Sequence, residues 1–566
     1  MMKRTFTLLI MILGLFPVLN AQTALSTDEF VNTQITGPGV YTVEAGKYYA
    51  FDGRIDLKFD ITIQGPEGTW IMDMVNPPVL LNTQGDDGNQ RQFFQIDEGG
   101  KLTLKNLILS GQNPEPTKRP GRVFINNANG SSLIVDNCVI STWRDFALRV
   151  QSQTADTLSV TNSIFLNGTR REFSQWGGFP VRLDQAPAQT IFENNTIYNC
   201  SRLLTNGGPF FAGKIHFNHN TVVNQMVSAE EQRALEVISA NNIYYNYHFL
   251  GHRTENHTSP DDNYATYFTG NNFFGEAKDR LDSISLYQGQ NLLYRPQAIS
   301  DWFDTNSGDS LSASLLWEHP DVDSFIVTDD NYRIGANYAQ IDPGFTTLAD
   351  NASRITDYLT LHYSTDENRI WPDWRIQAPI AYGDDGFPVL SWPPVFDLTY
   401  SNTALQTAGS DGLPLGDLNW YPEKKADYVT NRDTYIAALR DSMVNATVYY
   451  DPITMDNTPL LTELATSTKE LVDPNQLFLT GNFPNPFKET TTVKFGLKQP
   501  ADVTFAVYNL TGQRVFGATK KGLVAGTFQF NFNGSDLNSG IYIYKISAIA
   551  KDGLNYVATR KMVISK

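Results

Sequence analysis

With 566 residues, the chain exceeds the usual span of one compact core, and its formal net charge of −17 disfavours a general attraction to nucleic acid or to an anionic membrane. Charged residues make up only 18%, aromatic residues reach 12%, and 41 residues are Gly, a balance that favours strands and turns over helices. We therefore expect an all-β protein of two or three structural units without a nucleic-acid partner.

The N-terminus has the pattern of a secretory signal peptide over residues 1–21. Lys3 and Arg4 precede an apolar run from Leu8 to Leu19, and Ala21 stands directly before Gln22. No later stretch approaches the roughly 20 consecutive apolar residues that a membrane-spanning helix needs. The mature chain is therefore expected to be exported without a transmembrane segment.

From about residue 100, one phrase recurs: an apolar strand, an Asn and a second apolar strand, as in "LTLKNLILSG" and "LIVDNCVIST". The Asn residues follow one another at intervals of 21 to 33 residues, which indicates a stacked repeat. Asn suits a tight corner because it tolerates left-handed backbone geometry and its amide can hydrogen-bond along a stack of equivalent turns. The predicted corner residues are Asn106, Asn137, Asn162, Asn195, Asn220 and Asn241, with Asn271 as a further candidate.

This rhythm resembles the right-handed parallel β-helix of pectate lyases and related proteins, and the alternative is a β-sandwich with chance Asn residues. We assign residues 22–280 to the β-helix and residues 281–422, which are rich in Pro, Gly and Trp, to its end with long capping loops. Residues 423–476 are expected to form a helix and a linker, with Tyr435, Ala438, Leu439 and Met443 on one helical face. Cys138 and Cys200 fall about two coils apart, too far for a disulfide, so two buried free thiols are expected.

Residues 477–566 alternate with a period of two, as in Val493, Phe495 and Leu497, which predicts a small antiparallel β-sandwich. The segments "NFPNPF" from Asn482, "VYNLTGQRV", "LNSGIYIYK" and the terminal "KMVISK" resemble the type A C-terminal sorting domain of the type IX secretion system in Bacteroidota. That resemblance implies the type IX secretion machinery as a partner and a secreted, extracellular or outer-membrane-surface location. The alternative is an ordinary fibronectin-like accessory module.

Two segments of the repeat suggest a ligand site. "ALRV" and "PVRLD" place Arg149 and Arg182 outward between apolar neighbours, and Trp143 and Trp176 each lie six residues before one of these arginines. Strands about 4.8 Å apart would bring the two guanidinium groups together, so an anion is expected beside them. The anion could be Asp145, Asp184 or an acidic sugar, with the indoles stacking on sugar faces and Arg202 extending the row. The alternative is an Arg–Asp surface ladder with the Trp residues packed under loops.

The chemistry that the β-helix resemblance implies is β-elimination on a uronate. Arg149 and Arg182 would neutralise the sugar carboxylate, Arg182 would act as the base, and Asp145 and Asp184 could hold Ca²⁺. Hydrolysis is disfavoured because it needs two facing carboxylates at a defined separation. The chain lacks the catalytic sets of pectate lyases, polygalacturonases and pectin methylesterases, so enzymatic activity stays an open hypothesis.

Histidines give one further candidate, a transition-metal site at His248, His252 and His257, while His216 and His219 are expected to belong to the repeat strands. The sequence therefore favours a secreted or surface-attached β-helix protein that binds, and could cleave, an extracellular acidic polysaccharide. The competing hypothesis is a non-catalytic adhesin or structural surface protein.

Overall fold

The computed structural model describes residues 22–82, 92–111, 123–168, 177–185, 187–206, 212–226, 234–247, 249–250, 252–253, 285–306, 311–312, 332–334, 337–339, 341–348, 352–364, 381–382, 388–389, 392–445, 470–471, 477–509, 514–550 and 555–566. The expected signal peptide and Trp176, His248, His257 and Asn271 lie outside these residues. The chain divides into two compact units, residues 1–463 and 464–566.

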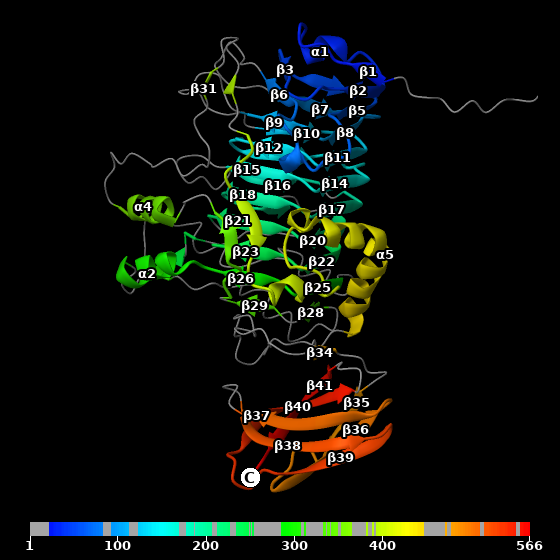
Figure 1. Cartoon of the computed structure of the whole chain (residues 1–566), viewed down its shortest axis with the longest axis vertical. Helices are drawn as coiled ribbons and strands as arrows, with labels where there is room; N and C mark the ends of the chain where they lie inside the picture. Colours follow the sequence, from blue (N-terminus) through cyan, green and yellow to red (C-terminus); the bar gives the residue numbers. More distant parts are fainter. Residues whose placement is uncertain are drawn as a thin grey trace, which may run out of the picture. The chain divides into compact units, whose positions relative to one another are not determined.

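The first unit is a stack of coils whose strands form three parallel sheets (Figure 1). Sheet A contains β1 (Gln22–Ala24), β2 (Gly39–Thr42), β5 (Asp60–Gln64), β8 (Lys101–Lys105), β11 (Ser132–Asp136), β14 (Thr157–Thr161), β17 (Gln189–Glu193), β20 (Ala212–Asn218), β22 (Ala234–Ala240), β25 (Ser285–Gly289) and β28 (Tyr332–Ile334). Sheet B contains β3 (Tyr48–Phe51), β6 (Val79–Asn82), β9 (Ile108–Ser110), β12 (Val139–Ser141), β15 (Ile164–Gly168), β18 (Thr196–Cys200), β21 (Thr221–Gln225), β23 (Ile243–Tyr245), β26 (Leu292–Tyr294) and β29 (Tyr338–Ala339). Sheet C contains β4 (Ile55–Leu57), β7 (Phe94–Ile96), β10 (Val123–Asn127), β13 (Phe146–Val150), β16 (Phe179–Leu183) and β19 (Leu204–Asn206).

These sheets confirm the expected all-β fold with parallel β-helix stacking. They also continue past the boundary expected at residue 280, because β25, β26, β28 and β29 extend sheets A and B to residue 339. The repeat is hard to follow there in the sequence because long insertions separate these strands.

The corner between sheets A and B consists of two residues, which corrects the single Asn row expected from the sequence. The first corner residue adopts φ between 52° and 61°, a left-handed conformation that Asn tolerates better than most residues. The second points its side chain into the coil. First-position residues are Asn106, Asn137, Asn162, Asn194, His219, Asn241 and Gln290, so the predicted Asn195 and Asn220 belong to the second position.

Second-position Asn side chains form a buried ladder. The Asn195 amide donates to Asn220 Oδ1 (3.0 Å), Asn220 donates to Asn242 Oδ1 (3.1 Å), and Asn242 donates to Asn291 Oδ1 (2.9 Å). Each Oδ1 also accepts the backbone N–H of the preceding Asn. The ladder therefore satisfies both backbone and side-chain polar groups inside the corner.

A second row of left-handed residues, which the sequence pattern did not reveal, lies within or just after the C-terminal ends of strands of sheet B. Its φ values lie between 56° and 63°. Asn224 Nδ2 donates to Asn199 Oδ1 and Asn246 Nδ2 donates to Asn224 Oδ1, both at 2.9 Å. The members are Thr142, Asn167, Asn199, Asn224 and Asn246.

The apolar core fills the interior of the coils with inward rows from all three sheets. One row stacks rings along the axis, with Phe192 and Phe217 centroids 5.3 Å apart and their planes within 10°. Cys138 and Cys200 lie in this core and are both free thiols, as expected.

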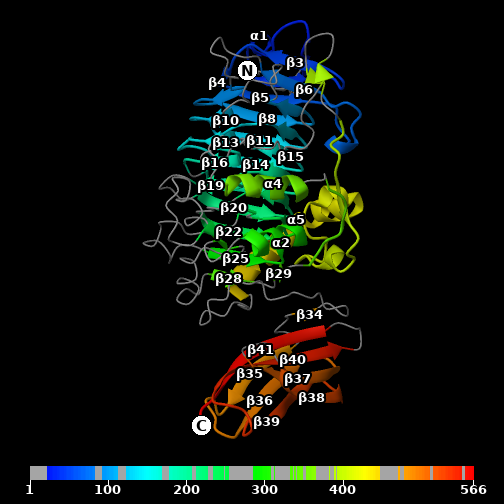
Figure 2. The ribbon, with the colours of Figure 1, turned by 90° about the vertical axis from the view of Figure 1, so that its left-hand side faces the viewer.

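Residues 392–445 run along the outside of the stack, from the level of the early coils near Met74 to the late coils at β22 and β25; we call this segment the strap (Figures 1 and 2). The Trp392 indole donates to the Met74 carbonyl, and Phe396 packs on Tyr198 with centroids 4.9 Å apart. The strap ends in α5 (Pro422–Asn445), whose Ile436, Leu439 and Met443 pack on sheet A. Ile436 rather than the expected Ala438 completes the buried face.

Short elements complete the first unit. They are α1 (Val31–Gln34), η1 (Ile71–Asp73), α2 (Gln297–Asn306), α4 (Ala352–His362), η4 (Leu405–Thr407) and η5 (Leu418–Trp420), and the pairs β24 (His252–Arg253) with β27 (Leu311–Ser312), β30 (Phe345–Thr347) with β33 (Asp397–Tyr400), and β31 (Ala381–Tyr382) with β32 (Pro388–Val389). Helices α2 and α4 share an apolar cluster with residues that follow strands of sheet B. In the described part of the chain, no helix is both long and apolar enough to cross a membrane.

The second unit is the expected β-sandwich. One sheet has the order β34 (Glu470–Leu471), β41 (Asn555–Ile564), β40 (Gly540–Ala550), β37 (Ala501–Tyr508), β38 (Arg514–Leu523), and the other β35 (Leu477–Phe483), β36 (Thr490–Leu497), β39 (Gly526–Asn533). The Pro-Asn-Pro turn joins the terminal strand, because Asn485 Oδ1 accepts the Val563 N–H (2.7 Å) and the Phe487 N–H bonds the Val563 carbonyl. The two most diagnostic sequence segments are thus in direct contact.

Candidate functional site

The outer face of sheet C carries a row of polar residues in register across adjacent coils. Arg149 on β13 lies beside Arg182 on β16, as the sequence predicts. In the backbone register, the positions next to this pair are Asn126 and Gln95 on one side and Thr205, whose side chain is not described, on the other. Parallel pairing without a shift therefore aligns outward side chains into a line perpendicular to the strands.

The two arginines share one carboxylate. Arg149 Nε donates to Asp184 Oδ2 (2.5 Å) and Arg182 Nε donates to Asp184 Oδ1 (2.6 Å). The three side chains are 30%, 14% and 17% exposed, in the order Arg149, Arg182, Asp184. These three side chains together carry two formal positive charges and one formal negative charge, on a strongly acidic chain.

Two phenyl rings lie beside the guanidinium groups. The Cζ atoms of Arg149 and Arg182 lie 5.7 and 5.0 Å from the Phe146 ring centroid, and Phe146 packs on Phe179 at 5.4 Å. Such cation–π contacts orient the guanidinium planes. We name Phe146, Arg149, Phe179, Arg182 and Asp184 the arginine cluster.

Sequence reasoning missed the two rings although the sequence contains a signal for them. "FALR" and "FPVR" repeat the spacing Phe-x-x-Arg on adjacent coils. The Phe146 ring lies beside the guanidinium groups of both Arg149 and Arg182, whereas Phe179 packs on Phe146 and lies beside Arg202.

The structure corrects the role expected for Trp143. Its side chain is completely buried in the core, where it packs edge-on against Phe165 (5.8 Å) and fills the space next to the Cα of Gly168. A core indole cannot stack on a sugar at the surface. The expected partner Trp176 lies outside the described residues.

Two further predicted site residues are placed differently from expectation. Asp145 is buried and forms an ion pair with Arg144 (3.3 Å), while Asp184 bridges the two outward arginines. Arg202 precedes β19 and lies outside the row, because Thr205 takes the position beside Arg182. The Arg202 guanidinium instead lies over Phe179, 5.2 Å from the ring centroid.

No group of three or more His, Cys, Asp or Glu side chains in the described part of the chain is arranged to hold a metal ion. Both oxygens of Asp184 already accept hydrogen bonds from arginines, which leaves little capacity for Ca²⁺. The side chain of His252 and the residues His248 and His257 are not among those described.

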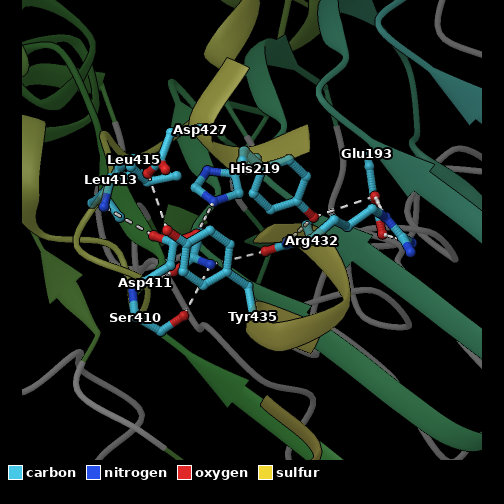
Figure 3. A network of polar contacts seen from close by, with 12 residues as sticks. Glu193, His219, Ser410, Asp411, Leu413, Leu415, Asp427, Arg432 and Tyr435 are labelled. Carbon is cyan, nitrogen blue, oxygen red and sulfur yellow. Dashed lines mark hydrogen bonds and ion pairs between the residues drawn. The ribbon is translucent and has the colours of Figure 1, made fainter. Parts of the chain in front are cut away.

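A second polar network, which the sequence also did not predict, lies between the strap and the corner of sheets A and B (Figure 3). His219 Nε2 lies 2.8 Å from Asp411 Oδ2, and its Nδ1 lies 3.2 Å from the Gly416 carbonyl. Both ring nitrogens of His219 therefore face acceptor oxygens. Burial would raise the pKa of Asp411, but the charge of His219 and its hydrogen bond hold that pKa below the ordinary value.

The same network includes an ion pair between Arg432 and Glu193. Arg432 Nη2 donates to Glu193 Oε1 (2.6 Å), and Arg432 Nε donates to Glu193 Oε2 (2.7 Å). The hydrogen bond to Glu193 raises the pKa of Arg432 above its ordinary value. Both pairs join residues about 200 positions apart in sequence, so local patterns could not reveal them. Because their charges are mutually satisfied, they attach the strap to the coils rather than form a reactive centre.

Comparison with known proteins identifies the second unit. Residues 482–565 match the family described as secretion system C-terminal sorting domain. This domain marks the protein for export by type IX secretion to the cell surface or the extracellular space, and it implies contact with the secretion machinery. No curated protein sequence matches the chain significantly.

Proposed function

We propose that this exported protein binds an extracellular acidic polysaccharide through the outer face of sheet C. The register of β13 with β16 supports the proposal most strongly, because it sets the guanidinium groups of Arg149 and Arg182 side by side with the Asp184 carboxylate between them. Guanidinium groups match the planar geometry of a uronate carboxylate. A local positive charge on an acidic chain favours an anionic ligand here over other faces.

The outer faces of the other two sheets support the same choice. Apolar side chains of sheet B pack beneath Phe396 and Leu398 of the strap, and sheet A packs beneath α5. On sheet C, by contrast, the Arg149 side chain keeps 30% of its surface exposed. The face of sheet C thus keeps a charged side chain of the arginine cluster accessible to a ligand.

Cleavage is not part of the proposal. In β-elimination, a base must remove the C5 proton of the sugar. The charged Arg182 guanidinium, which donates to Asp184, offers a cation to a sugar carboxylate rather than a base to a C–H group. Absorbance of unsaturated sugar ends, read in the same incubations as binding, measures whether a lyase step accompanies it.

Equilibrium binding of the mature protein to a panel of uronate-containing and neutral polysaccharides tests the proposal. We expect binding to the uronates only, weakened by salt because exposed charges are screened. Arg149→Ala with Arg182→Ala should weaken binding by at least about tenfold, since a charge-assisted hydrogen bond contributes about 1.5–3 kcal/mol. Arg440→Ala is the matched control, because Arg440 is an exposed arginine paired with Glu236 beside sheet A.

A structural surface rod is the second candidate, and the sharing of Asp184 by both arginines favours it. In that case the ion pairs with Asp184 only hold the two arginines in place on the surface of the coils. Absence of uronate binding in the wild-type protein, or unchanged binding in the double variant, would reject the glycan site and leave the rod.

A further inference from the structure

Three polar side chains meet at the start of α5, outside both clusters described above. Lys425 Nζ lies 2.5 Å from Asn419 Oδ1, and Asn419 Nδ2 donates to Asp417 Oδ1 at 2.6 Å. Asp417 and Asn419 are each only 2% exposed. An amine, a carboxamide and a carboxyl group are thus held in one buried chain of contacts.

Neighbouring residues fix the carboxyl group and the carboxamide of this triad. Thr196 Oγ1 donates to Asp417 Oδ2 (2.7 Å), and the Asn419 amide also donates to the Asn194 carbonyl (2.6 Å). The Trp420 indole donates to Thr196 (3.2 Å). The carboxamide is therefore oriented with its oxygen towards the amine and its nitrogen towards the carboxyl group.

We propose that Lys425 and Asn419 join in an intramolecular isopeptide bond, formed by the protein itself with Asp417 as the acid–base group. The amine nitrogen Nζ of Lys425 attacks Cγ of Asn419, a new C–N bond forms, and the Cγ–Nδ2 bond breaks. The proton lost by the amine ends on the leaving nitrogen, which departs as ammonia. Atoms and charge balance without an oxidant, a cofactor or an external donor.

Burial favours the uncharged reactants that this step needs. Desolvation lowers the pKa of Lys425, against the opposing charges of Asp417 and Asp136. Lys425 also lies in the first turn of α5, where the helix dipole disfavours a cation. An uncharged amine is the nucleophilic form of lysine.

Asp417 is prepared for its role by the same burial. Desolvation raises its pKa to about 7, while hydrogen bonds from Thr196 and Asn419 oppose the rise. A carboxyl group that titrates near neutral pH can accept and return a proton efficiently. It also touches the nitrogen that must leave, so a proton can reach that atom directly.

Proximity accelerates the reaction. The reacting groups are held in contact by a folded scaffold, and well-oriented intramolecular reactions reach effective concentrations of about 10⁵ M or more. The product would close a covalent loop from residue 419 to residue 425, at the point where the strap turns into α5. The bond would link the start of α5 covalently to η5, which contacts Thr196 of β18.

Mass spectrometry of the full mature chain tests the proposal. The protein is produced with one added N-terminal residue, because a terminal Gln22 can cyclise and also lose ammonia. We expect an intact mass lower than the sequence mass by one ammonia. Trypsin should release a branched species that joins peptides 376–424 and 425–432, because a modified Lys425 is no longer cleaved.

Variants assign the bond to the triad. Lys425→Arg should show its full sequence mass and no branched species, whereas Lys424→Arg, one residue earlier, should lose ammonia like the wild type. Asp417→Asn should reduce the linked fraction at least tenfold. Wild-type protein at its full sequence mass with Lys425 recovered unmodified would overturn the proposal, whether or not the variants fold. A linked fraction unchanged in Asp417→Asn would remove Asp417 from the mechanism.

Discussion

At the scale of single residues, two corner positions show how the chain places residues other than Asn in left-handed backbone. His219 and Gln290 have φ of 53° and 52°, in the position that Asn fills in five other corners. Each side chain gains a partner that offsets the conformational cost: His219 contacts Asp411, and Gln290 Oε1 accepts a hydrogen bond from the Tyr287 hydroxyl (2.8 Å). The contact of His219 with Asp411 of the strap therefore accounts for a histidine at this corner.

A double-mutant cycle at this corner provides the first prediction. His219→Asn keeps a residue suited to the corner but leaves Asp411 buried without its cation, which typically costs 3–5 kcal/mol. His219→Asn combined with Asp411→Asn removes both charges and should recover most of that loss. Urea unfolding of the three variants and the wild type measures the free energies. A double variant no more stable than His219→Asn would show that the two side chains do not act as a charged pair.

At the scale of elements, the sequence predicted the Asn-rich corners correctly but did not predict which of the two corner positions each Asn occupies. Regular spacing revealed the corners because Asn has a distinct backbone preference. It could not separate the two corner positions, since Asn194 and Asn195 are adjacent and His219 breaks the first row. Backbone geometry selects the first row, and burial with hydrogen bonding selects the second.

Position within the ladder should decide what a lost Asn costs. Asn220→Ala removes the acceptor for the Asn195 N–H and amide and the donor to Asn242, so both neighbours lose partners. Asn337→Ala affects the described ladder on one side only, at Asn291. Unsatisfied buried groups cost about 1–3 kcal/mol each. Thermal and urea unfolding should therefore show a greater loss for Asn220→Ala, and equal losses would contradict an extended ladder.

The candidate site was predictable only where it follows the repeat. Arg149 and Arg182 were placed correctly because an outward residue between two apolar ones depends on strand alternation alone. Trp143 was misplaced because it lies before its strand begins, where alternation gives no orientation. Contacts such as Thr196 with Asp417 join residues more than 200 positions apart, and no sequence period encodes them.

At the scale of the whole molecule, the chain combines a repeat unit with a sorting unit, and each has its own core. The first core fills the coils, and the second is formed by aromatic and aliphatic side chains of the sandwich, including Phe495, Phe505 and Tyr544. The second unit directs export, whereas the arginine cluster proposed to bind a ligand lies on the first unit. The sequence separated these roles well, because the sorting segments are compact and specific.

Separate cores predict separate unfolding. Fragments 22–463 and 464–566 should each unfold cooperatively, and calorimetry of the mature chain should resolve two transitions at the temperatures of the two fragments. Phe505→Ala removes a fully buried ring from the second core, so it should lower the free energy of unfolding of the sandwich by about 3–5 kcal/mol. Only the transition temperature of the sandwich should therefore fall. Leu133→Ala, equally buried in the first core, should lower only the other transition. If either substitution shifted both transitions together, the two units would be energetically coupled, and removal of the sorting unit after export would then weaken the β-helix.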